Sequence, residues 1–265
     1  MHSGRAVKHP RIEAALDGGI AGLAGGLFGV GGGLVLVPIL TGRFKLTQHQ
    51  AHGTSLAIIG ATALISVVVY ALNGNVAWLT AAPVGVASGF AARWGARLAA
   101  RTSAEVLAKA FAVFLLAVAI RLLWKTPAAA GHPFTGGVAV AVDLAVGVAV
   151  GLLAGYMGVG GGLIAVPAFT LLLGMTQQSA QGTSLAVILI TAPAGGLEHH
   201  RLGNVVTRIV PASAIGAAVV GPLASLLVQR LPHALLVRAF AVFVVLNAAS
   251  IWLRAERRKR QSARP

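Results

Sequence analysis

Two short motifs of small and polar residues could together bind an anion, and each motif occurs twice in the chain. A glycine-rich segment reads FGVGGGLVLVP at residues 28–38 and MGVGGGLIAVP at residues 157–167. The second motif, GTSLA, follows at residues 53–57 and 182–186. If each glycine segment separates two half-helices, backbone N–H groups and the helix dipole at the start of the second half-helix attract negative charge. Hydroxyl groups nearby can donate further hydrogen bonds.

We therefore take as substrate-binding candidates the loop glycines, the hydroxyl residues and the polar residue before each GTSLA motif. These are Gly31, Gly32, Gly33, His52, Thr54, Ser55, Gly160, Gly161, Gly162, Gln181, Thr183 and Ser184. Two structural alternatives stay open: the glycines could serve only close helix packing, and the hydroxyls could bond back to carbonyls of their own helix. His52 occupies the position of Gln181 in the other copy, which argues against an obligatory proton-carrying role for His52.

Other polar residues suggest less specific chemistry. Asp17 and Asp143 lie in apolar segments and are candidates for proton coupling, although they do not occupy equivalent positions. A Ser-His hydrolase built on Ser55 and His52 is disfavoured because the second copy lacks the histidine and no third orienting residue is evident. The segment EHHR at residues 198–201 is interpreted as an interfacial charged cap, so no metal site is expected.

The repetition covers nearly the whole chain. Residues 29 and 158 are 129 positions apart, and the same offset relates GNV at residues 74–76 to GNV at residues 203–205. It also relates AFAVF at residues 110–114 to AFAVF at residues 239–243. The chain is therefore one four-element unit, duplicated.

Composition indicates an integral membrane protein. Of the 265 residues, 57% are hydrophobic and only 10% are charged, and the mean hydropathy is +0.83. The net charge of +15 would suggest nucleic acid in a soluble protein. Here, however, the basic residues lie between or at the ends of apolar runs, so no nucleic-acid partner is expected. The chain has no cysteine.

The fold class predicted is all-α, with two repeats that each contain one broken helical hairpin and three transmembrane helices. Residues 12–42 would form a straight helix of about 46 Å, more than one crossing needs, so the glycines are expected to divide it. The first repeat is residues 1–126, with a hairpin at about 12–42 and helices at about 50–72, 76–99 and 104–124. A linker at 127–135 leads to the second repeat, 136–254, with a hairpin at about 138–174, helices at about 179–199, 205–229 and 233–253, and a basic cytoplasmic tail at 255–265.

The distribution of lysine and arginine favours hairpins that re-enter the membrane over hairpins that cross it. With a cytoplasmic N-terminus, re-entrant hairpins place 17 of the 21 basic residues on the cytoplasmic side, whereas crossing hairpins place 13 there. Three crossings per half is an odd number, so the two halves should lie upside down relative to each other. Inverted repeats with broken helices meeting near the midplane are typical of secondary transporters.

The paired G-x-G-G-G-x5-P motifs, each followed by A-x-G-T-S, resemble those of the sulfite exporter TauE/SafE family, also called the toluene sulfonate uptake permease family. The resemblance covers nearly all of the chain. It implies a bacterial inner-membrane transporter for small anions such as sulfite, thiosulfate or organosulfonates. The charge distribution predicts that both termini are cytoplasmic.

We expect a secondary transporter, an exporter, that works by alternating access around a midplane site formed by the glycine loops. Its partners are the small anion and the lipid bilayer, a homo-oligomer is compatible with the sequence, and neither a cofactor nor enzymatic activity is expected. An anion channel on the same scaffold and an intramembrane hydrolase are the alternatives.

Overall fold

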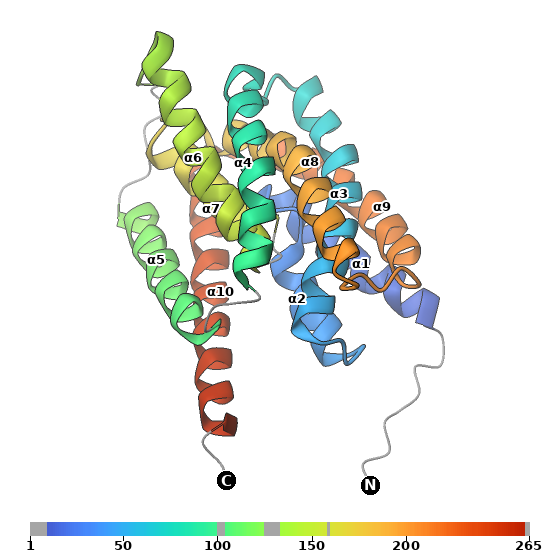
Figure 1. Cartoon of the computed structure of the whole chain (residues 1–265). Coiled ribbons are helices and arrows are strands. Elements are labelled where there is room, and N and C mark those ends of the chain that lie inside the picture. Colours follow the sequence, from blue (N-terminus) through green and yellow to red (C-terminus); the bar gives the residue numbers. More distant parts are fainter. Residues whose placement is uncertain (1–9, 100–103, 125–132, 158–159, 263–265) are drawn as a thin grey trace, which may run out of the picture.

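The chain folds entirely into helices in the part that the structure, a computed structural model, describes: residues 10–99, 104–124, 133–157 and 160–262. This confirms the all-α prediction. The first half contains α1 (Pro10–Phe28), α2 (Gly33–Gly42), α3 (Gln48–Leu72), α4 (Trp78–Ala99) and α5 (Ala104–Trp124). The second half contains α6 (Gly136–Met157), α7 (Gly162–Leu171), α8 (Gln177–Arg201), α9 (Val210–Gln229) and α10 (His233–Ser262) (Figure 1).

Two helix bounds differ from the sequence prediction by five residues or more. The helix predicted from residue 205 begins at Val210, because Pro211 favours the first turn of a helix over its interior. The helix predicted to end at residue 253 continues to Ser262, because no proline or glycine interrupts the charged segment after it. The residues expected to form a separate basic tail are therefore largely helical. Most of the predicted linker, residues 125–132, lies outside the described residues.

The longest apolar helices start and stop by the same local chemistry in both halves. Thr47 caps α3 by accepting a hydrogen bond from the Gln50 amide (3.2 Å), and Thr176 caps α8 by accepting one from the Ser179 amide (3.1 Å). At the other end, Gly74 and Gly203 both have positive φ angles, which end the helices in a left-handed residue.

Each glycine loop connects a long helix to a short one that turns back along it. Gly32 and Gly161, with φ of 87° and 83°, stand at the starts of α2 and α7. Arg43, directly after α2, forms ion pairs with Glu13 and Asp17 near the start of α1, so the two helices of this hairpin run antiparallel. With ten residues each, α2 and α7 are about 15 Å long, half the hydrocarbon thickness of a bilayer.

Glycine ridges bind each hairpin to the opposite half of the chain. Gly18, Gly22 and Gly26 on α1 face α9 so closely that an added Cβ at these positions would lie 2.0, 2.6 and 2.1 Å from backbone oxygens of α9. The equivalent Gly147, Gly151 and Gly155 on α6 have the same relation to α4, at 2.5, 2.2 and 2.0 Å. Small residues four apart allow helix backbones to approach in this way.

The two halves contact each other reciprocally around α3 and α8. The Thr54 hydroxyl accepts a hydrogen bond from the amide of Val206, and the equivalent Thr183 hydroxyl accepts one from the amide of Ala77, both at 3.0 Å. Each bond joins the first turns of one helix to the segment that follows the other. Therefore α3 and α8 run antiparallel, and the hairpins α1–α2 and α6–α7 enter the bundle from opposite ends (Figure 1).

The outer surface suits a lipid environment. Large apolar side chains are exposed along the helices, including Leu79 (94%), Phe90 (64%) and Leu246 (62%). Within the described residues, five helices are long and apolar enough to cross a membrane: α3, α6, α8, α9 and the part of α10 up to Glu256. The chain is a multi-pass membrane protein.

Candidate functional site

The two glycine loops meet at the centre of the bundle. An added Cβ on Gly162 would lie 2.5 Å from the Cα atom of Val30, so the second loop packs directly on the first. Gly31 and Gly160 both face Ile59, on α3, and its equivalent Ile188, on α8. These two isoleucines are fully buried and fill the space between the loops.

The other predicted glycines are also buried in close contacts. An added Cβ on Gly32 would lie 2.1 Å from the carbonyl oxygen of Ala21, and one on Gly161 would lie 2.7 Å from Val150. Gly33 is buried in the first turn of α2. In this conformation these glycines therefore serve the close packing of the hairpins.

Three of the four predicted hydroxyls are engaged by the protein. Thr54 and Thr183 accept the bonds from Val206 and Ala77 described above, and Ser184 Oγ donates to the carbonyl of Gly29 at 2.8 Å. Ser55, the equivalent of Ser184, is fully buried, and its Oγ has no hydrogen-bond partner within the described part of the chain. Ser55 thus remains available for a bond that this conformation does not make.

His52 faces a cavity of about 140 Å³ between α2, α3, α6 and α10. The Nε2 atom of His52 lies 2.7 Å from Nε2 of Gln48, one turn earlier on α3. Polar side chains from three helices line the cavity: Gln48, His52, Tyr156, Asn247, Ser250 and Arg254. Leu34 and Met157, next to the two glycine loops, also line it, so the cavity reaches the flank of both loops.

The walls of the cavity are mostly apolar, but they include groups that could bind an anion. Arg254 supplies a full positive charge, while His52, Gln48 and Asn247 add hydrogen-bond donors. No acidic side chain is among the residues that line it, all of which belong to the described part of the chain. A larger crevice of about 750 Å³ between α3, α8 and α9 has walls that are apolar except at His200 and Thr207, and it suits lipid better than an anion.

The remaining predicted donor, Gln181, is fully buried on α8 away from this cavity. Its Oε1 accepts a hydrogen bond from the hydroxyl of Tyr70 (3.1 Å), which also donates to the carbonyl of Gly26 (2.8 Å). Its Nε2 has no partner within the described residues. The structure therefore separates His52 and Gln181, which the repeat makes equivalent.

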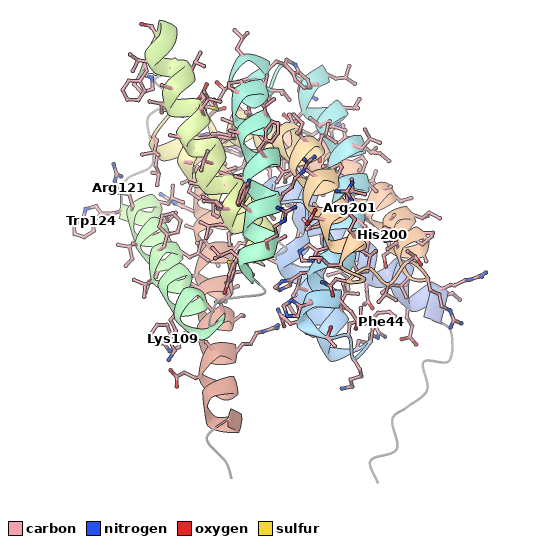
Figure 2. The ribbon with its side chains drawn as sticks, viewed as in Figure 1. Phe44, Lys109, Arg121, Trp124, His200 and Arg201 are labelled. Atoms are coloured by element: carbon pink, nitrogen blue, oxygen red, sulfur yellow. The ribbon has the colours of Figure 1, made fainter. Side chains whose placement is uncertain are left out.

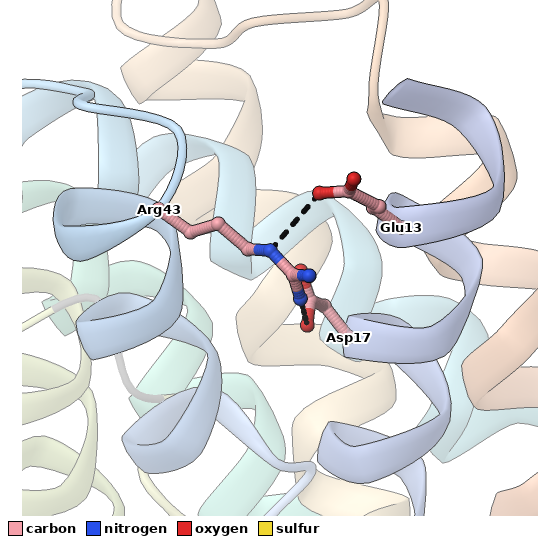
Figure 3. A network of polar contacts seen from close by, with 3 residues as sticks. All are labelled: Glu13, Asp17 and Arg43. Atoms are coloured by element: carbon pink, nitrogen blue, oxygen red, sulfur yellow. Dashed lines mark hydrogen bonds and ion pairs between the residues drawn. The ribbon is translucent and has the colours of Figure 1, made fainter. Parts of the chain in front are cut away.

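The two predicted aspartates have different surroundings. Asp17 is 3% exposed and receives a hydrogen bond from Arg43 at 2.8 Å, while Arg43 also pairs with Glu13 at 3.0 Å (Figure 3). This cluster joins the start of α1 to the end of α2. Asp143 is 4% exposed and lies on α6. Neither aspartate lines the 140 Å³ cavity.

Charged residues at the helix ends form pairs that suit a membrane interface. Glu198 pairs with Arg97 (3.1 Å) and Arg201 (3.8 Å), next to His200 at the end of α8 (Figure 2). On α5, Lys109 lies near one end, where it pairs with Glu256, and Arg121 lies near the other (Figure 2). Among the described residues, no group of three or more His, Asp or Glu is placed to hold a metal ion.

Sequence reasoning missed several residues of the cavity. Gln48 could have been found, because TQ at residues 47–48 recurs as TQ at residues 176–177 with the repeat offset. The cavity residues on α10 are Asn247, Ser250 and Arg254, about two hundred residues after Gln48 and His52 in the chain. No local sequence pattern connects them to the glycine loops. Tyr156 is adjacent to the second loop but has Leu27 as its equivalent.

The sequence profile described as "Sulfite exporter TauE/SafE" matches residues 2–122 and 142–265. The chain is 28% identical over 211 residues to a probable membrane transporter protein, YunE, of Bacillus subtilis, covering 71% of this chain and 77% of the relative.

Two other relatives have the same type of name. A probable membrane transporter protein of Xylella fastidiosa is 27% identical over 234 residues, covering 86% of this chain and 89% of the relative. One of Haemophilus influenzae is 35% identical over 117 residues, covering 42% and 44%. No solved structure matches the chain.

Proposed function

The chain belongs to the sulfite exporter TauE/SafE family, and from that premise we propose that it exports small sulfur-containing anions by alternating access. As a member of this transporter family, it is not an enzyme. The substrates proposed are sulfite, thiosulfate or organosulfonates. The observation that carries the proposal is the cavity lined by His52 and Arg254, because it combines donors and positive charge with direct access to the flank of both glycine loops.

In this proposal the substrate binds at the inner end of the cavity. There it is close to the first turn of α2, whose leading amides have no carbonyl partner earlier in the helix. Ser55, three residues after His52 on α3, has a hydroxyl without a partner among the described residues and would become a further donor when the helices move. Ile59 and Ile188 form the barrier beyond the site. Transport requires that the hairpins separate from these isoleucines, so that the loop glycines, Thr183 and Ser184 face the substrate in turn.

We place both termini and the cavity on the cytoplasmic side of a bacterial inner membrane. Residues within 247–255, in the later part of α10, line the cavity. The start of α1 and the end of α10 lie at the same end of the bundle (Figure 1). Lysine and arginine are concentrated at this end if the hairpins re-enter the membrane. The half-membrane length of α2 and α7 supports re-entry, and the antiparallel pairing of α3 and α8 supports two inverted repeats.

Single cysteines test this topology, because the natural chain has none. Leu72→Cys, at an exposed position that ends α3, should react with an impermeant thiol reagent added outside intact cells. Gly42→Cys, where a side chain would meet nothing within 4 Å, should react only after the membrane is opened. The reverse pattern would support hairpins that cross the membrane and halves that lie parallel.

In this proposal Asp17, rather than Asp143, carries the coupled proton. Asp17 has one oxygen bonded to Arg43 and a second, Oδ2, without a partner in the described part of the chain. Protonation would weaken the contact with Arg43 and so loosen the α1–α2 hairpin. Imposing a pH gradient across vesicles should then drive anion flux in the wild type and fail to drive it in Asp17→Asn.

Flux measurements in liposomes test the transport proposal directly. We expect saturable flux and counterflow of at least one of sulfite, thiosulfate and sulfoacetate, whereas a channel would show neither saturation at low substrate nor counterflow. Arg254→Gln should raise the KM for flux from the cavity side about tenfold, because a charge-assisted hydrogen bond is lost. Arg93→Gln is the control, since Arg93 lies over the ring of Phe90 and does not line the cavity.

Ser55→Ala sharpens the test within the site. If the Ser55 hydroxyl donates to the substrate, its removal should raise the KM. The variant should fold normally, because Ser55 Oγ has no hydrogen-bond partner among the described residues. An intramembrane hydrolase that uses Ser55 would instead lose all turnover. Glycine-to-valine changes in the loops are less informative, because a Cβ at Gly32 would strike the backbone of α1.

A further inference from the structure

The first turns of α3 and α8 carry equivalent pairs of polar residues in opposite surroundings. Gln48 and His52 are partly exposed, contact each other and line the cavity. Their equivalents, Gln177 and Gln181, are completely buried. The two equivalent positions therefore line a cavity in the first half of the chain and are buried in the second half.

The buried pair has hydrogen-bonding capacity that nothing uses. Both amide atoms of Gln177 and the Nε2 atom of Gln181 have no partner within the described part of the chain. Only Oε1 of Gln181 is satisfied, by the hydroxyl of Tyr70. Burying unpaired amide groups is costly, and buried polar groups in folded proteins nearly always have partners, so three idle atoms at one place require an explanation.

The residues equivalent to those that line the cavity are packed together in the other half of the chain. Leu34, Val37 and Pro38 line the cavity, and the residues equivalent to them, Leu163, Val166 and Pro167, are all buried. At the position of Met157, which lines the cavity, the first half has Phe28, whose ring stacks on Phe243 at 4.3 Å between centroids.

Hydrogen bonds also hold the start of α8 to the start of α10. The backbone amide of Gln177 donates to Nδ1 of His233 at 3.1 Å, and Nε2 of Gln178 donates to the carbonyl of Leu231, also at 3.1 Å. Both contacts join the start of α8 to the start of α10. They hold closed the end of the bundle opposite the cavity.

We infer that Gln177 and Gln181 form a second anion half-site, which contacts the same substrate when the protein opens on the side opposite the cavity. This inference rests on the proposed transport function and adds the residues that serve its other side. The ligand is an oxyanion, namely a sulfite, thiosulfate or sulfonate group. The neutral amide N–H groups of glutamine can donate hydrogen bonds to the oxygens of such a group. Gln48 and His52 are the corresponding half-site on the cavity side.

A glutamine that binds substrate and a glutamine that stabilises the fold predict opposite changes in melting temperature when Gln177 is replaced. Gln177→Leu replaces idle polar atoms by apolar ones of similar size, so the melting temperature in detergent should stay the same or rise. In vesicles with the protein in one orientation, the KM for sulfite or thiosulfate flux from the side opposite the cavity should rise about tenfold. The KM from the cavity side should not change.

Two variants provide the comparison. Gln48→Leu should show the mirror image, a raised KM from the cavity side alone. Gln178→Leu, next in sequence to Gln177, removes an amide that is already bonded to Leu231, and it should lower stability slightly without changing either KM. A lower melting temperature for Gln177→Leu with both KM values unchanged would overturn the half-site.

Cysteine labelling separates this inference from the transport proposal. Gln177→Cys, fully buried in the present conformation, should react slowly with an impermeant maleimide added on the side opposite the cavity. If the wild type transports none of the anions but Gln177→Cys is labelled from that side, the transport proposal fails and the opening of the half-site is supported. If Gln177→Cys is unreactive from both sides while flux is normal, the half-site is wrong.

Discussion

The hairpin and first long helix of each half, α1 to α3 and α6 to α8, contain the same motifs, yet they differ in what the motifs contact. In the first half, His52 reaches a cavity and Ser55 has an idle hydroxyl. In the second half, Gln181 is bonded to Tyr70 and Ser184 to Gly29. Two copies of one sequence pattern thus show two environments in a single conformation. The proposed alternating-access cycle requires such a difference between the halves.

A second difference concerns how the hairpins are fastened. Glu13, Asp17 and Arg43 join the helices of the first hairpin, whereas the equivalent positions in the second hold Val142, Val146 and Leu172. The packing of each hairpin against the opposite half, in contrast, is the same. The comparison therefore separates features that both halves need from features that only one has.

The largest expected effect is on the shared glycine ridges. Gly22→Leu and Gly151→Leu should each destabilise the fold by about 3 kcal/mol or more, because even a Cβ would lie within 2.6 Å of a carbonyl oxygen on α9 or α4. We expect little folded protein in detergent extracts of either variant. Gly137→Ala, where a Cβ meets nothing within 4 Å, is the control and should fold normally. Loss of folding in only one ridge variant would show that the halves are not packed equivalently.

An intermediate effect is expected at the cluster that only the first half has. Arg43→Gln leaves the side chain of Asp17, 4% exposed, without its half-exposed charged partner, and should lower the free energy of unfolding by about 2 kcal/mol. Thermal unfolding in detergent measures this.

Replacing the whole cluster by the residues of the second half tests the same point from the other side. The triple variant Glu13→Val, Asp17→Val, Arg43→Leu should be nearly as stable as the wild type. The ion pairs of the half-exposed Arg43 contribute little net stability, and apolar groups can replace the buried Asp17. Arg11→Gln, at an exposed position on α1, is the control. A triple variant less stable than Arg43→Gln would contradict this account.

The smallest effect is expected at the caps of α3 and α8. Thr47→Ala and Thr176→Ala each remove a hydroxyl that accepts a hydrogen bond from a first-turn amide, and each should cost about 1 kcal/mol. Equal shifts in melting temperature would show that helix initiation is the same in both halves and independent of the cavity. A much larger cost at Thr176 would indicate that the closed half depends on this cap.

Much of the helix pattern follows from local sequence. The interruption of the hairpins was predictable from the runs of glycine. The starts of α3 and α8, predicted at residues 50 and 179, lie two residues earlier, at Gln48 and Gln177. The glycine ridges on α1 and α6 were not identified, although their spacing of four residues is visible, because their partners on α9 and α4 lie far away in the chain. The cavity was missed for the same reason. Arg254 and His52 line it together only because α10 packs near α3 in the folded protein.

The sequence by itself determined that this protein is helical, lies in a membrane and is built from a duplicated unit, because hydrophobicity, helix breakers and repetition are properties of segments. Only the tertiary structure decided which copy of a motif is open and which is closed. Equivalent residues such as Gln48 and Gln177 have the same local preferences, so their exposure depends on contacts with helices from the other half, and those contacts are made in space rather than along the chain.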